Sequence, residues 1–267
     1  MIKYSMTGAQ DISRLEKQND QKSYDLSEEL NHFEFTNGDK VLDAGCGSGL
    51  VTRAIQSRHA QAKLKMEACD FSEIATENAA KFFSKEGIEV KTFVSDLEKI
   101  KASDNTYDKV ISRYVLEHMK EPVKAAHEFY RILRPGGKVF LIDLDGILFN
   151  FHSENEKLNY YLQKLKAGFK FDLFVGRKMN QFLFKAGFTD VKWEAVTINF
   201  NTPEELKMEV ENYEMRFNLA QSVITEVLGS ANDFEDFKKL YLSELASPQN
   251  LLFYTKFFVT GTVPLKK

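Results

Sequence analysis

The sequence predicts an α/β protein built around a mostly parallel sheet with helices on both sides. Short apolar runs alternate with helical stretches from Lys40 to Leu144, which implies right-handed crossovers between parallel strands. A glycine-rich turn, "VLDAGCGSGL", joins an apolar run to a helical stretch at residues 41–50. Acidic residues end successive apolar runs, at the edge where a parallel sheet presents groups to a ligand.

The first five strands and the helices between them follow from this alternation. Strands are expected at 40–44, 63–70, 89–96, 107–112 and 137–143, and helices at 50–58, 72–86 and 121–133. "RPGG" at 134–137 is a strong helix stop before the fifth strand.

The rhythm changes after Asp145. The pattern predicts a helix at 153–168, another within 175–188, a sixth strand at 190–200 and a final strand at 250–263 that runs antiparallel. Residues 203–246 look wholly helical, with Pro203 at a favourable starting position. Residues 10–34 suit one or two N-terminal helices.

Composition excludes several classes of protein. The formal net charge is −3 and no long basic run occurs, so nothing indicates capture of a nucleic-acid backbone. No apolar stretch approaches the roughly 20 residues that span a bilayer, and the N-terminus has no signal-peptide core. Two cysteines make no disulfide framework, and the five histidines show no metal-ligand spacing. We expect a soluble, cytoplasmic protein with no metal, no membrane and no nucleic-acid partner.

The glycine turn has an unusual neighbour. Its spacing is GxGxG, with Leu50 where a diphosphate-binding GxGxxG motif has its third glycine. Asp43 stands at the end of the strand, where a carboxylate repels a phosphate but suits a positive amino-acid group. S-adenosylmethionine is a ligand of that kind. Taken alone, the turn is equally an ordinary tight connection between a strand and a helix.

The ends of the next two strands strengthen this interpretation. Asp70 ends the second strand, where its carboxylate can accept hydrogen bonds from both ribose hydroxyls, and Phe71 can lie against the adenine. Asp96 ends the third strand and can accept from the adenine amino group, while Leu97 offers its backbone amide to the ring. One such acid is chance or a helix cap, but three acids beside a glycine loop are hard to explain structurally.

The segments "VLDAGCGSG", "ACDFS", "SDLE", "SRYVLEHMKEP" and "ILRPGGKVFLID" together resemble a class I S-adenosylmethionine-dependent methyltransferase of the small-molecule type. The resemblance covers roughly residues 38–145. It implies a Rossmann-like seven-stranded sheet of order 3-2-1-4-5-7-6 with the last strand antiparallel, and S-adenosylmethionine as the cofactor. The cofactor-binding residues it predicts are Asp43, Gly45, Cys46, Gly47, Gly49, Asp70, Phe71, Asp96, Leu97 and Arg113.

Methyl transfer from a sulfonium is an in-line displacement in which the protein mainly aligns the reactants and excludes water. His118, after the fourth strand, is the best candidate for a general base, and the alternative is a structural histidine in a helical turn. Candidate substrate contacts are Tyr24, Tyr114, Asp143 and Asp145, although "DLDG" is equally a turn. N-terminal helices often close over the cofactor in proteins of this pattern, so Arg14 and Gln18 are further candidates.

We expect a single domain over residues 1–267. It comprises an N-terminal helical cap (1–37), a cofactor-binding half (38–145) and a substrate half (146–267) with a helical insertion at 202–249. The insertion is either a lid over an apolar pocket or a dimer surface, and the chain is a monomer or a homodimer.

The predicted function is methyl transfer from S-adenosylmethionine to a small-molecule acceptor at oxygen, nitrogen or carbon. The main alternative is a non-catalytic S-adenosylmethionine-binding regulatory or partner protein, and a protein or RNA methyltransferase ranks lower. The glycine spacing argues against a nicotinamide-dependent oxidoreductase.

Overall fold

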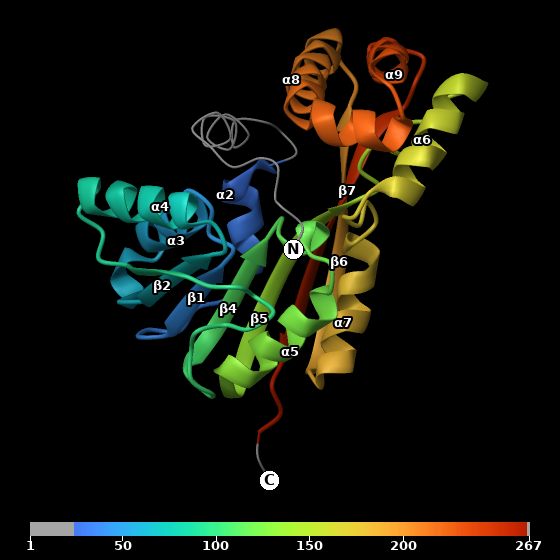
Figure 1. Cartoon of the computed structure of the whole chain (residues 1–267). Helices are drawn as coiled ribbons and strands as arrows, with labels where there is room; N and C mark the ends of the chain where they lie inside the picture. Colours follow the sequence, from blue (N-terminus) through green and yellow to red (C-terminus); the bar gives the residue numbers. More distant parts are fainter. Residues whose placement is uncertain (1–23, 266–267) are drawn as a thin grey trace.

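The computed structural model describes residues 24–265 and contains a seven-stranded sheet of order β3-β2-β1-β4-β5-β7-β6 (Figure 1). The strands are β1 (Lys40–Ala44), β2 (Lys65–Asp70), β3 (Lys91–Val94), β4 (Tyr107–Arg113), β5 (Leu133–Asp145), β6 (Thr189–Phe200) and β7 (Leu252–Thr262). Strands β1 to β5 are parallel, and β7 is antiparallel to both β5 and β6. The predicted fold class and strand order are confirmed.

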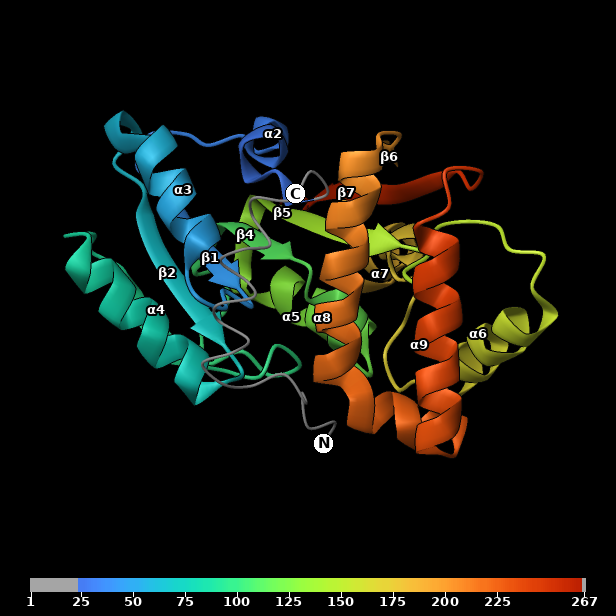
Figure 2. The same cartoon turned by 90° about the horizontal axis from the view of Figure 1, so that it is seen from above.

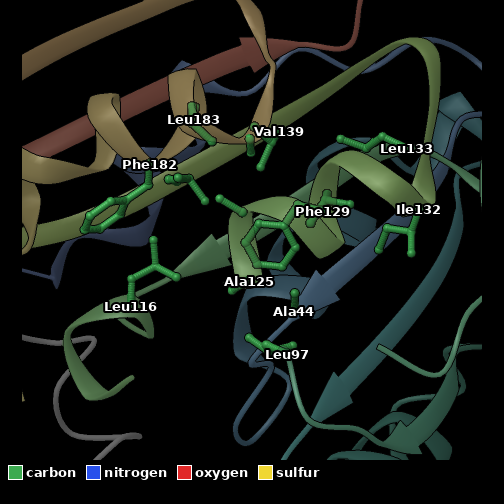
Figure 3. Close-up of a cluster of buried hydrophobic side chains, with 14 of the residues drawn as sticks. Ala44, Leu97, Leu116, Ala125, Phe129, Ile132, Leu133, Val139, Phe182 and Leu183 are labelled. Carbon is green, nitrogen blue, oxygen red and sulfur yellow. The ribbon is translucent and has the colours of Figure 1, made fainter. Parts of the chain in front are cut away.

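Helices cover both faces of the sheet. They are α3 (Leu50–Arg58), α4 (Glu73–Lys85), α5 (Pro122–Ile132) and α7 (Met179–Ala186). Buried side chains of α5 and α7 pack against one face of β1, β4 and β5, where Phe129 and Leu183 are completely buried (Figure 3). On the other face Val51 and Ile55 of α3 pack with Phe140 and Ile142 of β5. Burying both faces leaves only the strand ends to meet a ligand.

The junction between α5 and β5 differs from the sequence prediction. Helix α5 ends at Ile132, and β5 begins at Leu133 and runs through "RPGG" rather than after it. Gly136 sits at φ +81° and its amide donates to the Val263 carbonyl at 2.8 Å. The turn residues therefore stop the helix as predicted, but neighbouring strands hold them as an extension of the sheet.

The helical insertion consists of two helices, whereas residues 203–246 look wholly helical from their sequence. Helices α8 (Pro203–Leu228) and α9 (Ala231–Leu245) are separated at Gly229, which adopts the left-handed conformation at φ +102°. Ser230 then caps α9, its side chain accepting from the Asp233 amide. With α6 (Glu156–Gly168) they form a group beyond the carboxyl ends of the parallel strands (Figure 1). Seen from above, α8 lies between α9 and the strands β4 and β5 (Figure 2).

The N-terminal region that the structure describes contributes α2 (Leu26–Glu29) and a single 3-10 turn, η2 (Leu30–His32). Leu30 and Phe33 are buried against α3 and β5. The earlier part of the predicted N-terminal cap lies outside the described residues, and so do the candidates Arg14 and Gln18.

Candidate functional site

The glycine turn is anchored to the end of β2. The backbone amides of Gly45 and Cys46 both donate to the Cys69 carbonyl, at 2.8 and 2.9 Å. Gly45 and Gly49 both have φ +85°, where only glycine is free of strain. A side chain on Gly45 would also meet Val115 at 2.4 Å. Glycine is therefore required in this turn for two reasons: the backbone adopts a left-handed conformation, and the loop after β4 packs closely against Gly45.

Asp43 lies beneath this turn. It is almost completely buried, and one carboxylate oxygen accepts from the Thr52 hydroxyl of α3 at 2.7 Å. Burial raises the pKa of Asp43 to about 6, partly opposed by the hydrogen bonds from Thr52. Nearby Asp70 raises this pKa further and nearby Arg113 lowers it. Asp43 is thus a carboxylate that an added positive charge would stabilise.

Asp70 fastens the turn from the neighbouring strand. One carboxylate oxygen accepts from the Gly47 amide at 3.0 Å, and the other accepts from the Ser72 amide at 2.8 Å. The following Phe71 is 54% exposed, an unusual position for a phenylalanine beside a polar strand end. A fixed carboxylate and an uncovered aromatic ring thus lie next to each other at the edge of the sheet.

Asp96 and Leu97 follow β3. Asp96 is exposed, and its side chain accepts from the Glu98 amide at 2.8 Å. Leu97 is buried and packs in the core beside Ala44 (Figure 3). The carboxylate of Asp96 is therefore held in a local turn at the same sheet edge as Asp43 and Asp70.

Neither cysteine is activated. Burial raises the pKa of the Cys46 thiol well above its ordinary value, and it raises the pKa of Cys69 to about 12. Both thiols are protonated at neutral pH and so are poor nucleophiles. Cys46 fills space beneath the turn with Ala68, Ala79 and Phe83.

The segment after β4 lies against the glycine turn. Ser112 is buried, and no hydrogen bond from another described residue reaches its hydroxyl. Tyr114 adopts a left-handed conformation at φ +56°, which turns the chain so that Val115 faces Gly45. His118 ends the 3-10 turn η4 (Leu116–His118). Its side chain is 35% exposed, and Nε2 lies 3.3 Å from a Glu117 oxygen.

Arg113 and Tyr114 meet the N-terminal helix around a buried carboxylate. Glu29 of α2 is fully buried and forms an ion pair with Arg113. The Tyr114 hydroxyl and the Lys256 ammonium each donate to the same Glu29 oxygen at 2.5 Å. The Tyr24 ring stands edge-on to Tyr114 at 4.8 Å. Two predicted substrate residues are therefore in direct contact, although they are far apart in the sequence.

Asp143 and Asp145 at the end of β5 have different surroundings. Asp143 is fully buried and accepts from the Glu117 and Leu144 amides at 3.3 and 3.1 Å. Burial, with the nearby Glu117, raises the pKa of Asp143 well above its ordinary value. Asp145 is held by Arg177, whose backbone amide and Nε donate to it at 3.0 and 2.7 Å. Both carboxyl groups thus have structural partners.

Two charged residues of this edge were not predicted. Glu29 lies in a polar helix whose pattern shows nothing unusual. Lys256 carries a signal, because it interrupts the apolar run "LLFYTKFFV" of β7, and a lysine in a buried strand needs a partner. That partner is Glu29, from the other end of the chain.

Comparison with known proteins assigns part of the chain to a protein family. Residues 42–141 match the model of the methyltransferase domain family. The chain carries a class I S-adenosylmethionine-dependent methyltransferase domain. The match begins within β1 and ends within β5, so it includes the glycine turn and each of the strand-end acids Asp43, Asp70 and Asp96.

Curated relatives of this methyltransferase domain match part of the chain. One is a ubiquinone/menaquinone biosynthesis C-methyltransferase from Bdellovibrio bacteriovorus, 28% identical over 151 residues, with 49% of this chain and 63% of the relative covered. Another is a ubiquinone biosynthesis O-methyltransferase from Azotobacter vinelandii, 33% identical over 104 residues, with 39% of this chain and 43% of the relative covered. The chain thus spans less than two thirds of either relative.

Several solved structures resemble this chain over nearly its whole length. A phosphoethanolamine N-methyltransferase from Haemonchus contortus has a TM-score of 0.61 and 21% identity, covering 95% of this chain and 57% of that chain. The cyclase SpnF has a TM-score of 0.58 and 17% identity, covering 90% of this chain and 80% of that chain. At these identities the likeness shows the fold alone.

Among residues 24–265, no helix is long and apolar enough to cross a membrane.

Proposed function

We propose that this protein transfers a methyl group from S-adenosylmethionine to a small-molecule acceptor at oxygen, nitrogen or carbon. The observation that carries the proposal is the pair of hydrogen bonds from Gly47 and Ser72 to Asp70. They fix one acid beside the glycine turn, at the edge where Asp43 and Asp96 also end their strands. This arrangement favours a nucleoside joined to a cationic amino acid and opposes a diphosphate.

The residues present fit S-adenosylmethionine. In this proposal Asp43 and the turn residues Gly45, Cys46, Gly47 and Gly49 lie at the methionine part, Asp70 holds the ribose, and Phe71, Asp96 and Leu97 hold the adenine. The support for a ligand here is the exposed Phe71 ring and the buried Ser112 hydroxyl, which has no partner among the described residues. Arg113 acts on this site indirectly, since it is bound to Glu29.

The chemistry asks little of the protein beyond alignment. The bound sulfonium supplies an already activated methyl group, so the protein has to position the acceptor and keep water out. His118 is our candidate for removing a proton from the acceptor, because it is partly exposed beside the segment that touches the glycine turn. Asp143 is inaccessible and Asp145 is bound to Arg177, so their part is to hold this segment in place.

The substrate half (146–267) is proposed to cover the acceptor, with the insertion 202–249 as its lid. Support comes from the position of α8 and α9 beyond the strand ends (Figure 1) and from Arg216 of α8, which donates to the Tyr24 hydroxyl at 2.8 Å. A contact of that kind joins the insertion to the N-terminal cap (1–37) across the site. We further propose a single domain that acts in the cytoplasm as a monomer or homodimer without a nucleic-acid partner.

The names of the relatives support a small-molecule acceptor. Both curated relatives described above are named for the biosynthesis of ubiquinone, one of them also for that of menaquinone. Their similarity covers less than half of this chain, so the identity of their acceptors is not carried over.

The first experiment is calorimetric titration of the purified protein with S-adenosylmethionine, S-adenosylhomocysteine and NAD. We expect micromolar binding of the first two compounds and none of NAD. Release of S-adenosylhomocysteine in the presence of small acceptors would then measure turnover. Absence of binding to either sulfur compound would overturn the proposal.

A second candidate is a protein that binds S-adenosylmethionine without transferring its methyl group. The observation in its favour is that the cyclase SpnF shares this fold, and one fold supports many activities. Tight binding of S-adenosylmethionine with no methylated product from any acceptor class would favour this candidate.

A further inference from the structure

Arg216 is a charged residue on the inner side of the helical insertion that methyl transfer, as proposed above, does not use. Its guanidinium donates to the Tyr24 hydroxyl at 2.8 Å and to the Asn212 side-chain oxygen at 3.3 Å. Within residues 24–265 these are its hydrogen-bond acceptors, and no carboxylate forms an ion pair with it. A guanidinium has more N–H donors than two acceptors use, so Arg216 keeps donors for another group.

The buried carboxylates near Arg216 form no ion pair with it. Glu209 accepts from the Tyr254 hydroxyl at 2.9 Å and from Asn212 at 3.4 Å. Glu29 holds Arg113 and Lys256. The described part of this region therefore contains the cations Arg113, Arg216 and Lys256 but only two buried carboxylates. Glu209 acts on Arg216 as a neighbouring negative charge without direct contact, so an anionic ligand group would supply the direct ion pair that this partly buried guanidinium lacks.

Tyr213 provides a second and independent observation. Its ring lies 5.6 Å from the Arg216 guanidinium. Its buried hydroxyl lies beside Tyr241 and Tyr254 but forms no hydrogen bond of good geometry with a described residue. Buried hydroxyls normally have a partner. Arg216 lacks an ion pair with a described carboxylate and the neighbouring Tyr213 hydroxyl lacks a well-formed hydrogen bond, which is the pattern expected of a site for an anionic ligand group.

The location agrees with an acceptor site. Arg216 touches Tyr24, Tyr24 stands against the Tyr114 ring, and the residue after Tyr114 presses on Gly45 of the cofactor turn. Tyr254 and Lys256 reach the same region, because the first half of β7 pairs with the carboxyl end of β5. An anion on Arg216 would thus lie on the substrate side of the glycine turn.

We infer that Arg216, with Tyr24 and Tyr213, forms a subsite that binds an anionic group, a carboxylate or a phosphate, of the methyl acceptor. The assignment of the anion to a methyl acceptor rests on the proposed function. The anion site itself does not depend on it. The planar fork of arginine suits two oxygens of either group. The surrounding tyrosine and phenylalanine rings, including Phe217 and Phe237, favour an acceptor whose remaining part is apolar.

The test is calorimetric titration of the full-length protein, loaded with S-adenosylhomocysteine, with inorganic phosphate and separately with acetate. Ionic strength is held constant with chloride, so that only specific binding remains. We expect saturable millimolar or tighter binding of at least one of the two anions. Binding of phosphate alone assigns a phosphorylated acceptor, and binding of acetate alone assigns a carboxylate.

Variants connect the binding to the subsite. Arg216→Met should weaken anion binding at least about tenfold, whereas Lys207→Met, which removes a positive charge from the exposed side of the same helix, should leave it unchanged. Tyr213→Phe tests the neighbouring hydroxyl and should weaken binding while the protein stays folded, which keeps the test decisive if Arg216→Met does not fold.

Two results would overturn the inference: no saturable binding of either anion to the wild type, or equal binding by the wild type and the Arg216 and Tyr213 variants. If S-adenosylhomocysteine itself fails to bind, the proposed function fails, and the same titrations of the unloaded protein still decide the anion site.

Discussion

The carboxylate of Asp70 accepts a hydrogen bond from the backbone amide of Gly47 at 3.0 Å. This bond ties the end of β2 to the glycine turn that follows β1, across 23 residues of sequence. The second carboxylate oxygen of Asp70 accepts from the Ser72 amide, just before α4, at 2.8 Å. One side chain thus sets both the shape of the turn and the position of the acid that we assign to the ribose.

Removing this carboxylate should weaken cofactor binding. We expect Asp70→Ala to lose about 1–3 kcal/mol of binding free energy for S-adenosylmethionine, because hydrogen bonds to a charged acceptor are lost. Calorimetric titration measures the loss. Glu89→Gln, an exposed change after α4, is the matched control, and unchanged affinity in Asp70→Ala would remove Asp70 from the site.

Gly45 should tolerate no side chain. Gly45→Ala combines the left-handed conformation, which costs about 1–2 kcal/mol, with a contact of 2.4 Å to Val115. Gly38→Ala isolates the first effect, because Gly38 has φ +83° with nothing within 4 Å. In urea unfolding we expect Gly45→Ala to be less stable than Gly38→Ala by at least about 1 kcal/mol. Equal stabilities would show that the turn moves away from Val115 freely.

The ionisation of Asp43 should make cofactor binding pH-dependent. Its pKa is raised from 3.8 to about 6 by burial, so below about pH 6 the carboxyl is neutral and cannot attract a positive amino-acid group. Affinity for S-adenosylmethionine should therefore rise as pH increases through about 6, and Asp43→Asn should flatten this dependence.

The same shift affects stability with the opposite sign. Between about pH 4 and pH 6 the folded state binds more protons at Asp43 than the unfolded state does, so this contribution to stability falls as pH rises. Urea unfolding of the wild type and Asp43→Asn across this range measures it. A pH profile that Asp43→Asn leaves unaltered would contradict the assignment.

The Glu29 cluster should be important for stability. Glu29→Gln leaves Arg113 and Lys256 buried without their carboxylate, and breaking a buried pair in this way costs about 3–5 kcal/mol. The neighbouring Glu28→Gln, on the exposed side of α2, should change the free energy of unfolding little. A small loss in Glu29→Gln would mean that water or another residue replaces the carboxylate.

His118 should affect turnover more than cofactor binding. If it removes a proton from the acceptor, His118→Asn should lower kcat about a hundredfold or more while the affinity for S-adenosylmethionine stays the same. His127→Asn, an exposed histidine on α5, controls for the substitution. Equal rates at saturating acceptor would assign His118 a structural part in η4.

Much of this protein was readable from local sequence. Apolar periodicity, glycines at turns and acids at strand ends are properties of neighbouring residues, and they predicted the parallel strands, the helices between them and the glycine turn. The strand order followed from the resemblance to class I methyltransferases. Helix ends are only partly predictable from neighbouring residues. Pro203 marks the start of α8, but the pattern of residues 203–246 does not reveal the left-handed Gly229 that separates α8 from α9, because one glycine inside a helical pattern is often tolerated.

Only the tertiary structure decided which polar groups meet. Glu29 and Lys256 form an ion pair although 227 residues separate them, and Tyr24 reaches Arg216 over 192 residues. The carboxylate of Asp145, a predicted substrate contact, accepts a hydrogen bond from Arg177. Burial is set by the whole chain, and burial determines whether a charge needs a partner. The sequence by itself therefore determined the fold and the kind of cofactor, whereas long-range packing decided the buried charges that we propose select the acceptor.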